Sequence, residues 1–130
     1  MKSIVIAALL VSGCAAGSAG SRQIRDVEWA AVDVNGVPVT GTAPTMRLGQ
    51  RASGHGGCNS WSADYDLRSR DGIRFGPVAA TKMACAPEVM EQERRFLTVV
   101  EYAQGYSVYG DGSLSLIAGD GRAVRFRRAR

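Results

Sequence analysis

Turn signals at short intervals constrain the fold of this chain more than any other feature. Asn35-Gly36, Asp71-Gly72, Gly110-Asp111-Gly112 and Gly119-Asp120-Gly121 consist of residues that tolerate positive φ angles. Short segments with apolar and β-branched residues lie between these turns. The sequence therefore predicts an antiparallel sheet of short strands that curls into a small barrel.

Strands are expected wherever apolar and polar residues alternate. The alternation is clearest from Trp61 to Arg68, which predicts a single strand with one buried face. Gly54 to Asn59 is expected to be a glycine-rich loop. The other expected strands are Val27–Val34, Val37–Val39, Thr45–Leu48, Ile73–Phe75, Tyr106–Tyr109, Ser113–Ala118 and Ala123–Arg127.

One helix is predicted, over about residues 87–103. Pro87 suits the first helical turn, and Glu88 and Glu91 lie near the positive end of the helix dipole. An apolar stripe follows at helical spacing, and we expect Gly105 to end the helix. The stripe consists of Val89, Met90, Phe96, Leu97, Val100 and Ala103. The predicted fold class is therefore mainly β (α+β), with one helix packed across the barrel.

The N-terminal segment is expected to be a signal peptide. Lys2 precedes eight apolar residues, Ile4 to Val11, whereas a membrane span needs about 20. Leu10-Val11-Ser12-Gly13-Cys14 resembles the lipobox of bacterial lipoproteins. That resemblance implies fatty acyl chains, palmitate among them, on Cys14. An ordinary signal peptide with a chance cysteine is the alternative.

These features divide the chain into three parts. Residues 1–13 are expected to be removed, residues 14–23 to form a flexible tether, and residues 24–130 to fold as one domain. The formal net charge is +4, and arginines gather near the end of the chain. We expect a solvated strand end and no nucleic-acid binding, because exported proteins rarely meet nucleic acid. Weak contact with anionic lipid is the alternative.

The cysteine count agrees with export from the cytoplasm. Lipidation of Cys14 leaves Cys58 and Cys85, and an even count in an oxidising compartment predicts a disulfide. Two reduced and buried cysteines are the alternative. A bridge that closes a loop of this length stabilises the fold by about 3.5 kcal/mol in the chain-entropy model.

Several short motifs, in this order, resemble the META domain family (HslJ-like), over about residues 24–127. The motifs are Gly56-Gly57-Cys58-Asn59, Tyr65, Ile73-Arg74-Phe75-Gly76-Pro77, Thr81-Lys82-Met83-Ala84-Cys85 and Met90-Glu91-Gln92-Glu93-Arg94-Arg95-Phe96. The resemblance implies a small antiparallel barrel with one helix and no characterised enzyme activity. It also implies a link to envelope stress, heat shock and antibiotic tolerance.

The residues of these motifs are expected to have structural roles. They are Gly57, Asn59, Tyr65, Thr81, Met83, Glu93 and Phe96. Glu93 lies near the apolar stripe of the helix, so its carboxylate must stay solvated or find a donor. A backbone N–H and the Thr81 hydroxyl are the two candidate donors.

Catalytic and metal sites are not expected. His55, Cys58 and Cys85 supply only three zinc ligands, whereas a closed structural site needs four, and a disulfide would remove two. A hydrolase lacks support because no Gly-x-Ser-x-Gly elbow occurs. We predict no cofactor, no metal and no catalytic residue.

The expected function is that of a non-enzymatic lipoprotein monomer of the bacterial cell envelope. Ala15 follows the lipidated cysteine, and the absence of aspartate at that position favours the periplasmic side of the outer membrane. The expected partners are the membrane, through the lipid, and either a lipid or small apolar ligand or an envelope protein. A structural adaptor that acts only through protein contacts is the alternative, and a hydrolase is the third hypothesis.

Overall fold

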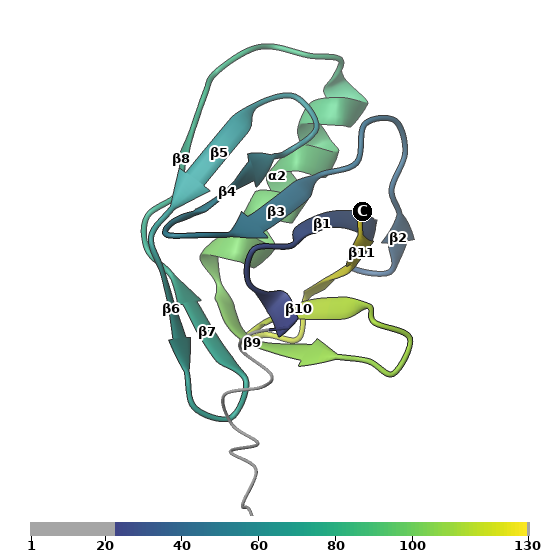
Figure 1. The fold of residues 1–130 in the computed structure, drawn as a ribbon. Coiled ribbons are helices and arrows are strands. Elements are labelled where there is room, and N and C mark those ends of the chain that lie inside the picture. The colour runs from purple at the N-terminus through teal and green to yellow at the C-terminus, as the bar shows by residue number, and fades with distance from the viewer. Residues whose placement is uncertain (1–22, 130) are drawn as a thin grey trace, which may run out of the picture.

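The structure is a computed structural model, and it describes residues 23–129. The described part consists mainly of short strands, with one long helix between β8 and β9 (Figure 1). The elements are β1 (Glu28–Val34), β2 (Val37–Pro38), β3 (Thr45–Leu48), β4 (Ala52–His55), β5 (Ser60–Ala63), β6 (Tyr65–Arg68), β7 (Gly72–Phe75), β8 (Ala79–Ala80), α2 (Pro87–Glu101), β9 (Ala103–Val108), β10 (Leu114–Ala118) and β11 (Ala123–Arg128).

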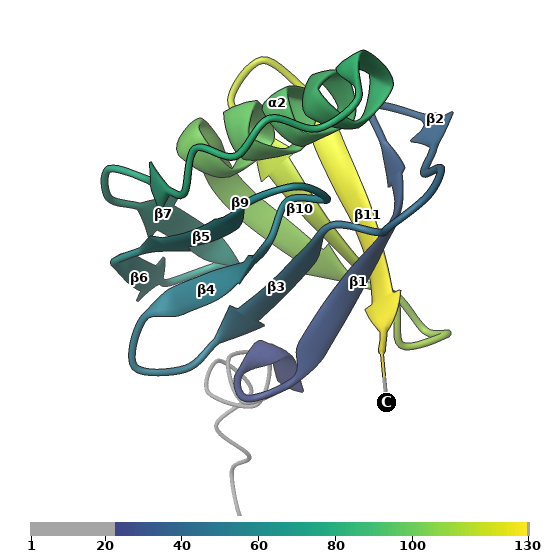
Figure 2. The same ribbon diagram turned by 90° about the horizontal axis from the view of Figure 1, so that it is seen from above.

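The strands form one curled antiparallel sheet. Its order is β6–β7–β9–β10–β11–β1–β3–β4–β5–β8, and β2 pairs with β1. Figure 2 shows the sheet curving beneath helix α2, which lies across one side of it. This confirms the predicted fold class, a small antiparallel barrel-like sheet with one helix packed across it.

A bent hairpin brings the two ends of the sheet together. β5 continues into β6 through Asp64, and β7 continues toward β8 through residues 76–78. One half of this hairpin pairs with β4 and the other half with β9. At the bend, the amide of Gly76 donates to the carbonyl of Asp64 over 2.8 Å. The prediction of a single strand from Trp61 to Arg68 is therefore wrong, because the chain must bend at Asp64 to reach both neighbours.

Apolar side chains fill the interior of the curled sheet. Trp29, Phe96 and Phe126 have no exposed surface. The ring of Phe96 lies edge-on to Trp61 and to Phe126, with centroids 6.0 Å apart in both pairs. Ile24, Met46, Leu48, Ile73, Val99, Val100, Leu114, Leu116 and Val124 complete the fully buried set. Each such side chain stabilises the fold by about 1.5–3 kcal/mol relative to an exposed position.

Helix α2 begins at Pro87, as predicted, but ends at Glu101 rather than near residue 103. Ala103 is already the first residue of β9, where it pairs with Ala118 of β10. Gly105 lies inside β9 and does not end the helix. The fully buried face of the helix is narrower than the predicted stripe and includes a carboxylate. It consists of Glu93, Phe96, Val99 and Val100.

The first predicted hairpin turn is confirmed, and the second is displaced by one residue. Asn35 and Gly36 have φ angles of 52° and 78°, as the mirror-image turn requires. In the second turn the positive φ angles belong to Arg70 and Asp71, both at 60°. Gly72 is instead the first residue of β7. A Cβ on Gly72 would lie 3.0 Å from Cβ of Arg68, a tight contact that glycine avoids.

The predicted loop from Gly54 to Asn59 is in part a strand. Gly54 lies in β4 and pairs with Trp61 of β5. A Cβ on Gly54 would lie 2.0 Å from the carbonyl oxygen of Thr45. The same oxygen accepts a hydrogen bond from Nε1 of Trp61 over 3.1 Å. The glycine therefore permits a close approach within a strand, which composition alone does not distinguish from a loop.

Candidate functional site

Most of the motif residues meet around one buried carboxylate, that of Glu93. Glu93 lies in the middle of α2 and is 5 % exposed. One carboxylate oxygen accepts hydrogen bonds from the amides of Cys58 and Asn59, over 3.1 and 2.6 Å. The other accepts a hydrogen bond from Nδ2 of Asn59 over 2.7 Å. These three donors replace the water that a buried carboxylate loses.

Asn59 extends these contacts to the segment that precedes the helix. Its Oδ1 accepts hydrogen bonds from the hydroxyl of Thr81 over 3.0 Å and from the amide of Met83 over 2.6 Å. The Thr81 hydroxyl oxygen also accepts a hydrogen bond from the amide of Ser60 over 3.2 Å. We call Cys58, Asn59, Thr81, Met83 and Glu93 the Glu93 cluster. It joins a loop, the segment before the helix, and the helix itself.

Two glycines shape the loop around Glu93. A Cβ on Gly56 would lie 2.5 Å from a carboxylate oxygen of Glu93, so glycine alone allows the carboxylate to approach. Gly57 has φ of 115°, a conformation that favours glycine. Its amide donates to Nδ1 of His55 over 3.1 Å. The backbone conformation of residues 56–59 therefore directs two N–H groups toward one carboxylate oxygen of Glu93.

The cysteine prediction is confirmed. Cys58 and Cys85 form a disulfide, with Cα atoms 6.0 Å apart. Cys58 is buried and Cys85 is exposed. The bridge ties the same loop to the same pre-helix segment that the hydrogen bonds of Asn59 connect. It also excludes the zinc hypothesis for His55, because both cysteine sulfurs are bonded to each other.

Two further motif residues, Phe96 and Tyr65, lie outside the Glu93 cluster, and Met83 joins the cluster only through its backbone. Phe96 belongs to the core, and the side chain of Met83 is 56 % exposed while its amide is held. Tyr65 is half-buried, and its hydroxyl donates to the carbonyl of Gly49. Burial raises the pKa of Tyr65, an effect that the nearby Arg25 opposes. Tyr65 thus joins the bent hairpin to the β3–β4 turn.

Every member of the Glu93 cluster is recognisable from the sequence motifs, but the contacts between the members are not. Of the two candidate donors, the backbone N–H is correct. Thr81 reaches Glu93 only through Asn59. A close approach at Gly56 is what its lack of a Cβ predicts, but Glu93 as the approaching group and the part played by Ser60 were missed. The sequence places Glu93 three residues before Phe96 of the apolar stripe, which was the signal available for the burial of its carboxylate.

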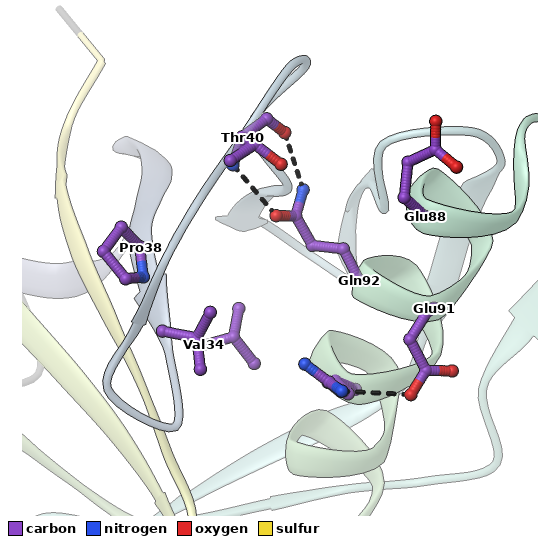
Figure 3. Close-up of a pocket in the computed structure, with 8 residues that line it drawn as sticks. Val34, Pro38, Thr40, Glu88, Glu91 and Gln92 are labelled. Carbon is purple, nitrogen blue, oxygen red and sulfur yellow. Dashed lines mark hydrogen bonds and ion pairs between the residues drawn. The ribbon is translucent and has the colours of Figure 1, made fainter.

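A separate surface groove of about 210 Å³ lies between helix α2 and the chain that follows β1 (Figure 3). Val34, Val37 and Pro38 form its apolar side, and the helix contributes Glu88, Glu91, Gln92 and Arg95. Gln92 pairs with the backbone of Thr40, since its Oε1 accepts from the Thr40 amide and its Nε2 donates to the Thr40 carbonyl, both over 3.0 Å. This pairing holds the two walls together.

At the edge of the groove, Glu91 forms ion pairs with two arginines of the same helix. Glu91 accepts hydrogen bonds from Arg94 and Arg95, over 2.6 and 3.1 Å. The hydrogen bond from Arg94 lowers the pKa of Glu91, which therefore stays ionised in mildly acidic solution. The groove is smaller than the roughly 300–1,000 Å³ of a typical small-molecule pocket.

Among residues 23–129, no group of three or more His, Cys, Asp or Glu side chains is placed to bind a metal ion. Within the same described range we find no helix with the length and hydropathy of a membrane span. The predicted lipidation site, Cys14, and the predicted signal peptide lie outside the described residues.

Comparison with solved structures supports the fold. The chain is similar to a protein from Burkholderia xenovorans solved by NMR, with a TM-score of 0.69 and 19 % identity, covering 98 % of this chain and 99 % of that one. A second NMR structure matches with a TM-score of 0.68 and 22 % identity, covering 83 % of this chain and 93 % of that one. At these identities the likeness concerns the fold alone. A search of the curated proteins finds no match.

The family model described as META domain matches residues 22–130. The match includes the complete Glu93 cluster, the disulfide and every strand and helix described above. The chain therefore belongs to the META domain family.

Proposed function

We propose that this protein is a lipid-anchored, non-enzymatic module of the bacterial cell envelope that binds an envelope protein through its outer surface. The anchor is the acylated Cys14, and the expected setting is stress or antibiotic tolerance, as the family resemblance implies. The periplasmic side of the outer membrane is the proposed location.

The packed interior of the sheet is the observation that supports binding at the outer surface. An apolar ligand inside the barrel would need a cavity, but Trp29, Phe96 and Phe126 occupy that space without exposed surface. A packed core of this kind has few voids larger than a water molecule. A partner must therefore be bound from outside, which favours protein contacts over an enclosed lipid.

The groove beside helix α2 is the proposed contact. Val37 on its apolar side is 52 % exposed, so about half of this aliphatic side chain is open to contact with a partner. Gln92 and the Glu91 ion pairs supply a polar rim. An apolar centre with a polar rim is the common anatomy of a protein interface.

The arrangement around Glu93 supports a structural role rather than catalysis. Both carboxylate oxygens accept hydrogen bonds from the protein, so the group has donors on both sides and little exposure. His55 accepts a hydrogen bond at Nδ1 from the amide of Gly57. The side chains of the most distinctive motif are thus accounted for by holding the fold together.

Two measurements on the full chain, expressed in a Gram-negative host with its own N-terminus, test this proposal. The first is the mass of the mature protein, which should include acyl chains on Cys14 and lack residues 1–13. The second places a photo-crosslinking residue at Val37, with Val108 as the matched control because it is also an exposed valine, at 36 %. We expect a discrete adduct with an envelope protein from Val37 and none from Val108.

Each result can contradict the proposal. If the mass of the mature protein includes no acyl chains, the proposed lipid anchor at Cys14 is wrong. A lipid that co-purifies in a fixed ratio in native mass spectrometry, together with no adduct at Val37, favours the apolar-ligand alternative. Adducts of equal yield from both positions show that the groove has no special role.

A further inference from the structure

The charged side chains are distributed unevenly between two opposite sides of the domain. Helix α2 carries four glutamates and two arginines, a net charge of 2 − 4 = −2. Figure 2 shows the helix on one side of the sheet, and the start of the described chain and the end of β11 on the opposite side. On that opposite side, four arginines are exposed: Arg25, Arg47, Arg127 and Arg128. We call these four the basic rim.

Backbone contacts hold two arginines of the basic rim beside the beginning of the domain. Nη1 of Arg47 donates to the carbonyl of Asp26 over 3.2 Å. Nη2 of Arg128 donates to the carbonyl of Gln23 over 3.3 Å. Each guanidinium has five N–H donors, so both keep free donors after these contacts. Their positive charge is fixed in place but not neutralised.

Aromatic rings orient two guanidinium groups of the rim. Arg128 lies over the ring of Trp29, 5.4 Å from its centroid. Arg25 lies over the ring of Tyr65 at 5.6 Å. A ring beneath a guanidinium limits its motion and leaves its edge available for planar, two-pronged hydrogen bonds. Phosphate oxygens are well-matched acceptors for that geometry.

None of the four rim arginines forms an ion pair within the described residues. Other arginines do, namely Arg51, Arg68, Arg94, Arg95, Arg122 and Arg125. Asp26 and Glu28 are the exposed acidic residues beside the rim, so its net charge is 4 − 2 = +2. The side of the molecule where the chain enters the domain is therefore basic, while the helix side is acidic.

The proposed tether brings this basic side close to a membrane. Between Cys14 and Ile24 there are nine residues, 15–23. A chain of that length spans at most about 30 Å, and about 15–18 Å on average if it is flexible. Electrostatic attraction acts over about 8–10 Å at physiological salt. An acylated Cys14 therefore allows the basic rim to reach the lipid headgroups.

We propose that the basic rim docks on anionic phospholipid headgroups, so that helix α2 and its groove face away from the bilayer. This inference rests on the acylation of Cys14 in the proposed function and adds an orientation to it. The acidic helix is repelled by the same surface that attracts the rim, and both forces favour one orientation. The groove is then presented to proteins of the periplasm.

Arginine footprinting on the full acylated protein tests this orientation. The protein is reconstituted in vesicles of phosphatidylcholine alone, or of phosphatidylcholine with phosphatidylglycerol, and modified with phenylglyoxal before mass analysis. We expect slower modification of the rim arginines in the anionic vesicles, reversed by high salt. Arg94, on helix α2, is the internal control and should react equally in both. Equal reactivity of the rim in both vesicles overturns the proposal.

A pair of double variants separates docking from general charge. Arg25→Gln with Arg47→Gln should weaken docking about 25-fold, since each arginine near an anionic surface contributes about fivefold. Protection of Arg127 and Arg128 should then disappear. Arg94→Gln with Arg95→Gln should leave that protection unchanged. Circular dichroism confirms that each variant is folded. Loss of protection in both double variants contradicts a localised docking surface.

The two proposals fail in different ways. If the mature mass lacks acyl chains, the proposed anchor is wrong. Docking of the basic rim is then tested by the same arginine footprinting on protein that is mixed with the two kinds of vesicle. If the protein is acylated but the rim reacts alike in both vesicles, the anchor remains and the docking surface is wrong.

Discussion

Glu93 and Asn59 hold each other through two hydrogen bonds, one to each carboxylate oxygen. The main-chain amide of Asn59 lies 2.6 Å from one oxygen, and its side-chain amide lies 2.7 Å from the other. The two residues are 34 positions apart in the chain. This contact fixes the middle of helix α2 against the loop that enters β5, and the rest of the Glu93 cluster is built around it.

Glu93→Gln should destabilise the protein. Three N–H donors face the carboxylate, whereas a glutamine has one acceptor oxygen and an NH₂ group that must face at least one donor. Loss of hydrogen bonds to a buried charged group and an unsatisfied donor cost about 2–3 kcal/mol. Urea unfolding measured by circular dichroism gives the free energy of unfolding.

Glu101→Gln is the matched control for that variant. Glu101 is exposed at the last turn of the same helix and forms no ion pair among the described residues. A surface substitution of this kind changes stability by about 0.5 kcal/mol or less. A loss at Glu93 no larger than at Glu101 contradicts the structural role of the cluster.

Removal of the disulfide should have a larger effect. The bridge closes a separation of 27 residues, for which the chain-entropy model gives about 3.5 kcal/mol. The Cys58→Ala, Cys85→Ala double variant should lose that stability in urea unfolding. Addition of a reductant should destabilise the wild-type protein to the same level and leave the double variant unchanged. A protein equally stable with and without reductant contradicts this prediction.

Gly56→Ala should disturb the Glu93 cluster from the loop that faces the carboxylate. The new Cβ would lie 2.5–2.9 Å from Glu93 side-chain atoms, so the carboxylate must move away from its donors. We expect a loss of about 2–3 kcal/mol, the upper part of the range for overpacking. Gly110→Ala is the control, because its Cβ meets nothing within 4 Å and its φ angle is not positive.

A double-mutant cycle distinguishes this mechanism from a general effect of alanine. In the Glu93→Gln background the hydrogen bonds that Gly56→Ala displaces are already weakened. The loss of unfolding free energy in the double variant should therefore be smaller than the sum of the two single losses, by at least about 0.5 kcal/mol. Strict additivity shows that Gly56 and Glu93 act independently, contrary to the contact described here.

Local signals were sufficient to predict much of the fold. Turn chemistry located Asn35-Gly36, and the pairing of Cys58 with Cys85 followed from the cysteine count and the predicted export. The start of the helix at Pro87 is also a local property, because proline fits the first turn without loss of a hydrogen bond. Such features depend on a few neighbouring residues, and the structure confirms them.

The errors concern features that depend on distant partners. The stretch from Trp61 to Arg68 alternates without a break, yet it bends at Asp64 because its two halves pair with β4 and, through β7, with β9. The donors of Glu93 come from a loop 34 residues earlier. Spacing along the chain carries no information about either relationship, which tertiary packing alone establishes.

Tyr65 should give the protein a dependence of stability on alkaline pH. Burial raises its pKa above the ordinary value of 10.0, so the folded state favours the neutral phenol that donates to Gly49. A group whose pKa is higher in the folded state stabilises the fold fully below its unfolded pKa. That contribution is lost as the pH rises from about 10 through the folded pKa.

The Tyr65→Phe variant isolates this group. It should lose about 1 kcal/mol at neutral pH with the hydroxyl hydrogen bond, and the gap to the wild type should narrow above pH 10 or so. The difference in tyrosinate absorbance between wild type and variant should give a midpoint above 10.0, the ordinary pKa of a tyrosine side chain. A midpoint at or below that value means that the Tyr65 hydroxyl does not hold the bent hairpin to the β3–β4 turn, because a phenol engaged in that contact must resist ionisation.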